Sequence, residues 1–202
     1  MGHDCCHSHD FDGMNDDYKR RLWVVIALNA VMFVVEIIAG SIAGSQALWA
    51  DSLDFLADTL TYGISLAVIG MPIHVRSNVA LLKGVSLSVM GVWVLASTVY
   101  QVFVLNVPAA PVMASVAMAA LAANALSVLL LVKYKDGDAN VRSVWLCSRN
   151  DMIGNIAVAA AAFGVWKSDT AWPDLAVAGL MSALFLSSSF RILQQAYAER
   201  RS

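Results

Sequence analysis

The stretch Ala-Leu-Trp-Ala-Asp-Ser-Leu-Asp-Phe-Leu-Ala-Asp, residues 47–58, begins an apolar block that continues to residue 71. A block of this length matches the roughly 20 residues that cross a bilayer as a helix. Its three acids, Asp51, Asp54 and Asp58, follow one another at offsets of three and four, so a helix carries all of them on one face. A charge inside a membrane costs about 2.5–3.5 kcal/mol on insertion scales, which makes these acids candidates for a function.

Five further apolar blocks of similar length make up most of the chain. Apolar residues are 59% and charged residues 14% of the 202 residues, whereas a soluble domain has about 45–50% apolar and about 25% charged residues. The sequence therefore predicts an all-α membrane protein with six transmembrane helices. The predicted spans are residues 22–44, 47–71, 79–104, 109–132, 142–166 and 172–194.

Three parts are expected along the chain. They are a His/Cys-rich tail at 1–18, a six-helix transmembrane domain at 19–196 and a short end at 197–202. The loops are short, the longest running from Pro72 to Asn78, and short loops favour antiparallel neighbours in a bundle.

The distribution of Lys and Arg predicts the orientation. Lys19, Arg20 and Arg21 precede the first span and Arg200 and Arg201 end the chain, whereas the loops on the opposite face contain only Lys167. Because positive loop residues favour the cytoplasmic side, both termini are expected in the cytoplasm. No basic aromatic patch suggests nucleic acid.

A second helix offers ligand chemistry. Cys147 and Asp151 lie four residues apart in the fifth span and share a face. Together with Asp54 and Asp58 they make four ligands on two helices, a number that suits tetrahedral zinc-like coordination. The alternative for Cys147 is a small buried apolar residue. For Asp51, a solvated position near the end of its span is equally compatible with the sequence.

Other polar residues in the spans are candidates for accessory roles. Asn155 lies one turn beyond Asp151 and fits either a ligand or a hydrogen bond between helices. For Asn124, a hydrogen bond between helices is the favoured interpretation. Glu36 fits a proton path or outer vestibule as well as a structural hydrogen bond.

The N-terminal tail is a separate candidate for metal binding. It has imidazole and thiol groups within seven positions, and short His/Cys tracts are typical of metal capture. The alternative is a tail without a function, because the spacing matches no closed structural zinc site. The residues are His3, Cys5, Cys6, His7 and His9.

Two of these stretches resemble a known family. Residues 47–58 resemble the second-span motif of the cation diffusion facilitators, a His or Asp, three residues, then Asp. Cys147 and Asp151, which follow Asn140-Val141-Arg142, resemble the fifth-span stretch, usually His, three residues, then Asp. Residues 29–40 resemble the first span, and Asn124 and Pro173-Asp174 also fit.

The resemblance covers about residues 20–196 and implies metal/proton antiport by alternating access, usually in a homodimer. It makes Asp54 and Asp58 the ligands of the second span and Cys147 and Asp151 those of the fifth. Metal ligands must be deprotonated, so protons and metal compete for such a site. The expected form is a compact one without the cytoplasmic C-terminal domain of many members.

Two departures from the family pattern bear on the site. Cys147 replaces the usual histidine, and a thiolate favours zinc, cadmium or copper(I) over harder ions. Arg149 and Asn150 stand where small or apolar residues are usual. Arg149 lies about 200° round the helix from both Cys147 and Asp151, so it is expected to point away from the site.

The leading functional hypothesis is efflux of a divalent transition metal, zinc-like with cadmium and cobalt as further candidates, across the plasma (inner) membrane. Protons are the expected counter-ion, and no cofactor is expected. A non-transporting membrane metal sensor is the alternative, and a drug/proton antiporter is less compatible with paired ligand motifs. An enzyme is not expected, because no nucleophile–base arrangement or phosphate loop is found.

Overall fold

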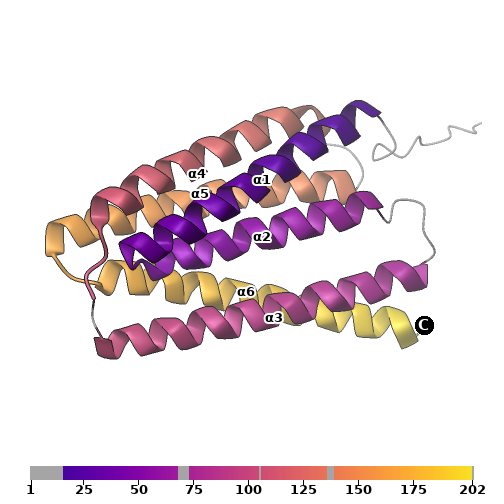
Figure 1. The fold of residues 1–202 in the computed structure, drawn as a ribbon. Helices are drawn as coiled ribbons and strands as arrows, with labels where there is room; N and C mark the ends of the chain where they lie inside the picture. Colours follow the sequence, from indigo (N-terminus) through magenta and orange to yellow (C-terminus); the bar gives the residue numbers. More distant parts are fainter. Residues whose placement is uncertain (1–15, 68–72, 105, 136–138, 202) are drawn as a thin grey trace, which may run out of the picture.

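The computed structural model describes residues 16–67, 73–104, 106–135 and 139–201, and this part of the chain is helical with no strand. The described residues form six long helices. These helices lie side by side, and the described chain begins and ends at the same end of the bundle (Figure 1). We call this the termini end and the opposite one the turn end, where the α1–α2 turn lies. The elements are α1 Asp16–Ala43, α2 Gln46–Ala67, α3 Ile73–Val104, α4 Ala110–Leu131, the short 3₁₀ helix η2 Val132–Tyr134, α5 Ala139–Ser168 and α6 Trp172–Arg201.

The six predicted spans are confirmed as helices, with one correction to a loop. Residues 73–78 were expected in a loop, but α3 already begins at Ile73. The reason is that no proline or glycine occurs from Ile73 to Lys83, so nothing interrupts the helix. Residues 68–72 lie outside the described part of the chain, and α6 continues through the predicted short end to Arg201.

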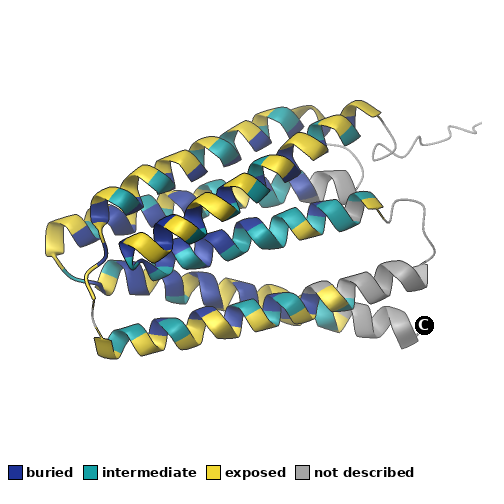
Figure 2. Cartoon of the chain, viewed as in Figure 1, coloured by how far each residue is buried: buried dark blue, intermediate teal, exposed yellow. Residues whose placement is uncertain are grey.

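The surface of the bundle is suited to lipid. Large apolar side chains are exposed on its outside, among them Trp93 at 63%, Phe103 at 82% and Trp166 at 69% (Figure 2), and so large an apolar surface marks a membrane contact. Four described segments are long and apolar enough to cross a bilayer, in α1, α3, α4–η2 and α6. Helices α2 and α5 carry the acids instead.

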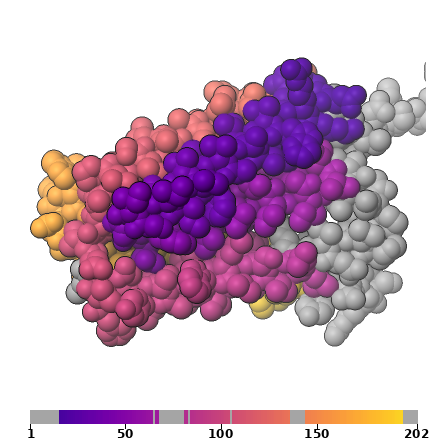
Figure 3. Space-filling view, viewed as in Figure 1, coloured from indigo at the N-terminus to yellow at the C-terminus, as the bar shows by residue number. Residues whose placement is uncertain are grey.

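The helices form two groups. Helices α1, α2, α4 and α5 pack together, whereas α3 packs most extensively against α6. In Figure 3, α1 and α2 cover one face of the molecule with α3 below them. The α3–α6 contact depends on two glycines, because a Cβ atom on Gly84 would lie 2.8 Å from Leu193 Cδ2 and one on Gly91 2.9 Å from Leu186 Cγ. Such distances are shorter than van der Waals contact, so a side chain at either position would require Leu193 or Leu186 to move, and glycine permits the close approach of the two helices.

A buried carboxylate joins α6 to the start of α2 and to the turn before it. Asp174 in the first turn of α6 is 1% exposed. It accepts hydrogen bonds from Ser45 Oγ at 2.6 Å, Gln46 N at 2.8 Å and Ala47 N at 3.1 Å. Ser45 Oγ in turn accepts from Leu48 N at 3.1 Å. Asp174 therefore satisfies backbone N–H groups at the start of α2, which have no partner inside their own helix.

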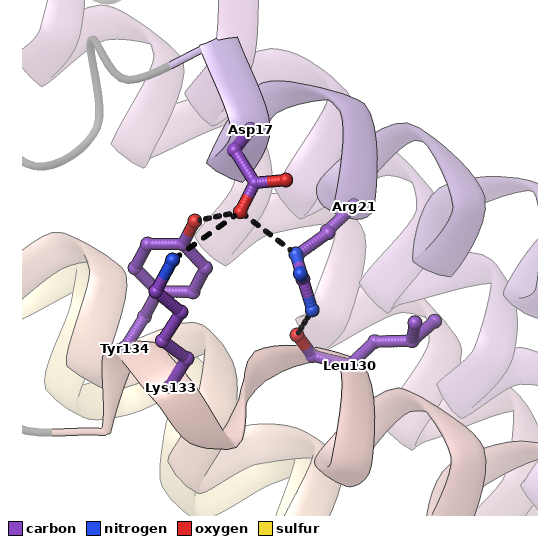
Figure 4. Close-up of polar contacts among 5 residues, drawn as sticks. All are labelled: Asp17, Arg21, Leu130, Lys133 and Tyr134. Carbon is purple, nitrogen blue, oxygen red and sulfur yellow. Dashed lines mark hydrogen bonds and ion pairs between the residues drawn. The ribbon is translucent and has the colours of Figure 1, made fainter.

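A second polar cluster joins α1 to the end of α4 at the termini end (Figure 4). Tyr134 donates its hydroxyl to Asp17 at 2.6 Å, and Arg21 Nε lies 3.0 Å from the same carboxylate. Lys133 lies 3.8 Å from it, and Arg21 also donates to the Leu130 carbonyl at 3.1 Å. Asp17 precedes the predicted span, and the hydroxyl of Tyr134 holds the pKa of that carboxyl below its usual range.

Candidate metal site

The acids of α2 and α5 meet inside the four-helix group. Asp54 and Asp58 from α2 and Asp151 from α5 line one narrow crevice. The crevice is too narrow to accept a sphere of the size of water. Its remaining lining comes from α1, α2 and α4 and consists of Asn29, Phe55 and Asn124.

The three carboxyl groups are close neighbours. Asp151 is near enough to Asp54 and to Asp58 for their carboxyl groups to share hydrogens. Its Oδ2 atom is buried and has no hydrogen-bond partner among the described residues. Buried carboxylates this close repel one another unless a cation or a proton lies between them.

The predicted ligands do not form a coordination shell in the described structure. Within the part of the chain that the structure describes, no three His, Cys, Asp or Glu side chains stand arranged to hold a metal ion. Cys147 is not among the residues that line the crevice. It packs against the apolar cluster that contains Tyr62 and Leu131, towards the termini end. Metal binding by all four predicted ligands therefore requires side-chain movement.

Tyr62 is a residue that the sequence analysis missed. It lies one turn after Asp58 on α2, is 1% exposed and donates its hydroxyl to Asp58 Oδ2. It also lies within electrostatic range of Asp151 and Cys147. The phenol thus lies among three of the four predicted ligands. The only signal in the sequence is the i, i+4 spacing from Asp58, which places Tyr62 on the same face.

The accessory candidates form a second layer towards the turn end. Asp51 is 2% and Asn155 0% exposed. When the Asn155 amide is oriented with its nitrogen towards Asp51, this nitrogen donates to Asp51 Oδ1 at 3.0 Å and to Asp51 Oδ2 at 2.5 Å. The amide oxygen of Asn155 then accepts a hydrogen bond from Asn124 Nδ2 at 2.9 Å. Asp51 is therefore buried rather than solvated, and Asn124 makes the predicted interhelical hydrogen bond. Glu36 is 0% exposed and lies next to Asp51.

Arg149 points away from the acids, as predicted. It is exposed, its guanidinium carbon lies 5.5 Å from the centre of the Trp145 ring, and Nη2 is 3.4 Å from Asn150 Oδ1. A cation at this position does not compete with a metal ion for the carboxylates. The tail candidates His3, Cys5, Cys6, His7 and His9 lie outside the described residues.

The arrangement is that of a multi-pass membrane protein with acidic residues enclosed between helices, which is typical of ion pathways. The family sequence model described as the cation efflux transmembrane domain matches residues 22–72 and 74–199. The chain therefore belongs to the cation efflux family.

Two relatives, both named for metal efflux or zinc transport, match most of the chain. The metal cation efflux system protein CzcD of Cupriavidus metallidurans is 26% identical over 93% of this chain and 62% of its own length. The zinc transporter ZitB of Escherichia coli is 27% identical over 96% of this chain and 66% of its own length. The chain thus spans about three fifths of the length of CzcD.

Proposed function

We propose that this protein exports a divalent transition-metal ion, zinc-like in its chemistry, from the cytoplasm across the inner membrane. The observation that supports this most strongly is the meeting of Asp54, Asp58 and Asp151 in one crevice between α2 and α5. Two relatives are named as a metal cation efflux protein and a zinc transporter, which supports the same class of substrate.

In this proposal Asp54, Asp58 and Asp151 bind the ion and Cys147 completes the set. Cys147 lies one turn from Asp151 and within electrostatic range of it, so a change of side-chain rotamer is the smallest movement that would bring the thiol to the ion. Four ligands of this kind suit zinc, and the thiolate also favours cadmium, with cobalt as a further substrate.

Protons are the proposed counter-ion. Carboxylate and thiol ligands bind metal only when deprotonated, so each ion that binds releases protons and each protonation favours release of the ion. A pH gradient would then drive the ion out on the side where the site is protonated. Both termini are proposed to lie in the cytoplasm, because the positive loop residues cluster at the termini end of the bundle and such residues favour the cytoplasmic side.

The test is pH-gradient-driven uptake into proteoliposomes of zinc, cadmium, cobalt, nickel and manganese. Asp54→Asn removes a proposed ligand charge and should abolish uptake. Asp169→Asn is the matched control, because Asp169 is an exposed turn residue at φ 51°, a conformation that Asn tolerates well. Cys147→His should keep uptake and change the ranking of the ions.

A non-transporting metal sensor is the outcome that would replace this proposal. It predicts that the folded native chain binds metal but moves none into sealed vesicles. A homodimer is implied by the family resemblance, and the mass of the complex in nanodiscs tests it. A monomer that transports would contradict the dimer and leave the proposed activity standing.

A further inference from the structure

A second acidic pair lies between the crevice and the α1–α2 turn. Glu36 of α1 is 0% exposed, and neither of its carboxylate oxygens has a hydrogen-bond partner among the described residues. The carboxyl group of Asp51 is near enough to share a hydrogen with it. Two carboxylates that face each other away from water are stable together only with positive charge between them.

This pair adjoins the crevice without lining it, and both acids lie within electrostatic range of Asp54. Neither Glu36 nor Asp51 belongs to the crevice lining. Asp51 precedes Asp54 by three residues, which is about 4.5 Å along the axis of α2. The two places are linked through Asn124, which lines the crevice and donates to Asn155, the residue that holds Asp51.

The two acids differ in how they are held. Asp51 is fixed by the Asn155 amide, which donates to both of its oxygens at 3.0 and 2.5 Å. Glu36 has no such donor in the described part of the chain. Burial of an unpaired carboxylate is strongly unfavourable, so the fold keeps a ligand group that none of the described side chains satisfies.

We propose that Glu36 and Asp51 form a second binding site for a divalent cation. The transported ion occupies this site on its way between the crevice and the turn end of the bundle. This inference rests on the proposed transport and adds a step to its route. Two carboxylates balance the charge of a divalent ion, and amide oxygen or water completes the shell. The donors are all oxygen, so an ion held here makes no bond to a thiolate, whereas an ion in the crevice site does.

Cadmium binding to the full-length chain separates the two sites. Of the three cysteines, Cys5 and Cys6 are replaced by serine and the tail histidines by glutamine, so that Cys147 is the only thiol. Ultraviolet absorption from a cadmium–thiolate bond then reports the Cys147 site alone. Equilibrium dialysis counts all bound cadmium.

The tail-substituted chain should bind two cadmium ions, one of them linked to the thiolate. Glu36→Gln, which keeps the shape of the side chain, should lose one ion and retain the thiolate absorption. Asp54→Asn should lose the thiolate-linked ion and retain the other. Asp51→Asn repeats the Glu36→Gln test, and unchanged size-exclusion and circular dichroism profiles ensure that loss of binding is not loss of fold.

Three outcomes would count against the second site or the first. One bound ion in the tail-substituted chain, unaffected by Glu36→Gln, overturns the second site and leaves the proposed transport site standing. If the pair instead shares a proton, the tail-substituted chain would again bind one ion, and Glu36→Gln would change the number of protons released when cadmium binds. This result also overturns the second metal site. Absence of thiolate-linked cadmium in every variant contradicts the proposed function itself, whatever the total count.

Discussion

The two ends of the bundle are held by carboxylates in opposite ways. At the turn end, Asp174 is 1% exposed and accepts three hydrogen bonds, two of them from the backbone of α2. At the termini end, Asp17 has a side chain 45% exposed and meets Arg21 and Lys133 at the surface. Burial strengthens the interactions of a charge, and water and salt weaken those of an exposed one. The carboxylate contact at the turn end should therefore contribute more to stability than the one at the termini end.

Asp174→Ala should show the largest effect. It leaves Ser45 Oγ and the N–H groups of Gln46 and Ala47 without their acceptor. Hydrogen bonds to a buried charge are worth about 1.5–3 kcal/mol each, and they are not additive, so we expect a loss of about 3 kcal/mol in the free energy of unfolding in detergent. Asp169→Asn, which removes the charge of a nearby exposed acid at a position where φ is 51°, is the control, because Asn tolerates this conformation. Equal destabilisation by both changes would contradict the role given to Asp174.

Tyr62→Phe should have the next largest effect, on metal affinity rather than on stability. Tyr62 belongs to the apolar cluster at the termini end and donates to Asp58, so it connects that end to the site. Groups that orient a metal ligand typically contribute about 10–100-fold to affinity, and we expect zinc to bind about tenfold more weakly. Calorimetric titration measures this. Tyr134→Phe, which removes a hydroxyl bonded to Asp17, should leave zinc affinity unchanged.

Ser45→Ala tests the turn end more gently. The change removes one donor to Asp174 and the acceptor of Leu48 N, whereas the two backbone bonds to Asp174 remain. Loss of a helix cap of this kind costs about 1 kcal/mol. A thermal unfolding midpoint that falls less than in Asp174→Ala would fit the comparison, and an equal fall would show that the hydroxyl, not the backbone bonds, carries the interaction.

Asp17→Asn should have the smallest effect and show no resolvable change in the unfolding midpoint at physiological salt, because exposed ion pairs contribute little. The pKa of Asp17 is lowered, chiefly by the Tyr134 hydroxyl. Its contribution is therefore fully present above the usual carboxyl range and is lost as pH falls through the lowered pKa. A chemical-shift titration of the Asp17 carboxyl, native against Tyr134→Phe, should show the midpoint rise in the variant. A clear loss of stability in Asp17→Asn would contradict the contrast between the ends.

The helices and the acids of the site could be predicted from the sequence, but the contacts between them could not. Offsets of three and four between Asp51, Asp54 and Asp58 determine which face of α2 they share. Spacing placed Cys147 one turn from Asp151, but it did not show that Cys147 packs against an apolar cluster and lies outside the crevice lining. Spacing within one helix does not reveal what the neighbouring helices present to each residue.

Residues whose partners lie far along the chain were the hardest to interpret. Tyr62 looks like an ordinary packing residue in an apolar span until α5 is placed beside it. Asp174 was noted only because Pro173-Asp174 fits the family resemblance. Its hydrogen-bond partners lie 127 to 129 residues earlier in the chain, so the sequence did not reveal them. Glu36 and Asp51 lie on different helices, and only the antiparallel packing of α1 on α2 brings them together.

The Asp174 contact also places a constraint on biosynthesis. The chain is made from its N-terminus, so the turn between the first two helices leaves the ribosome long before its acceptor, which follows Ser45 by 129 residues. During that interval the donors of Ser45, Gln46 and Ala47 lack the acceptor that the folded protein gives them. The start of α6 therefore completes a turn made much earlier, and a nascent chain that stops before α6 lacks this contact at its turn end.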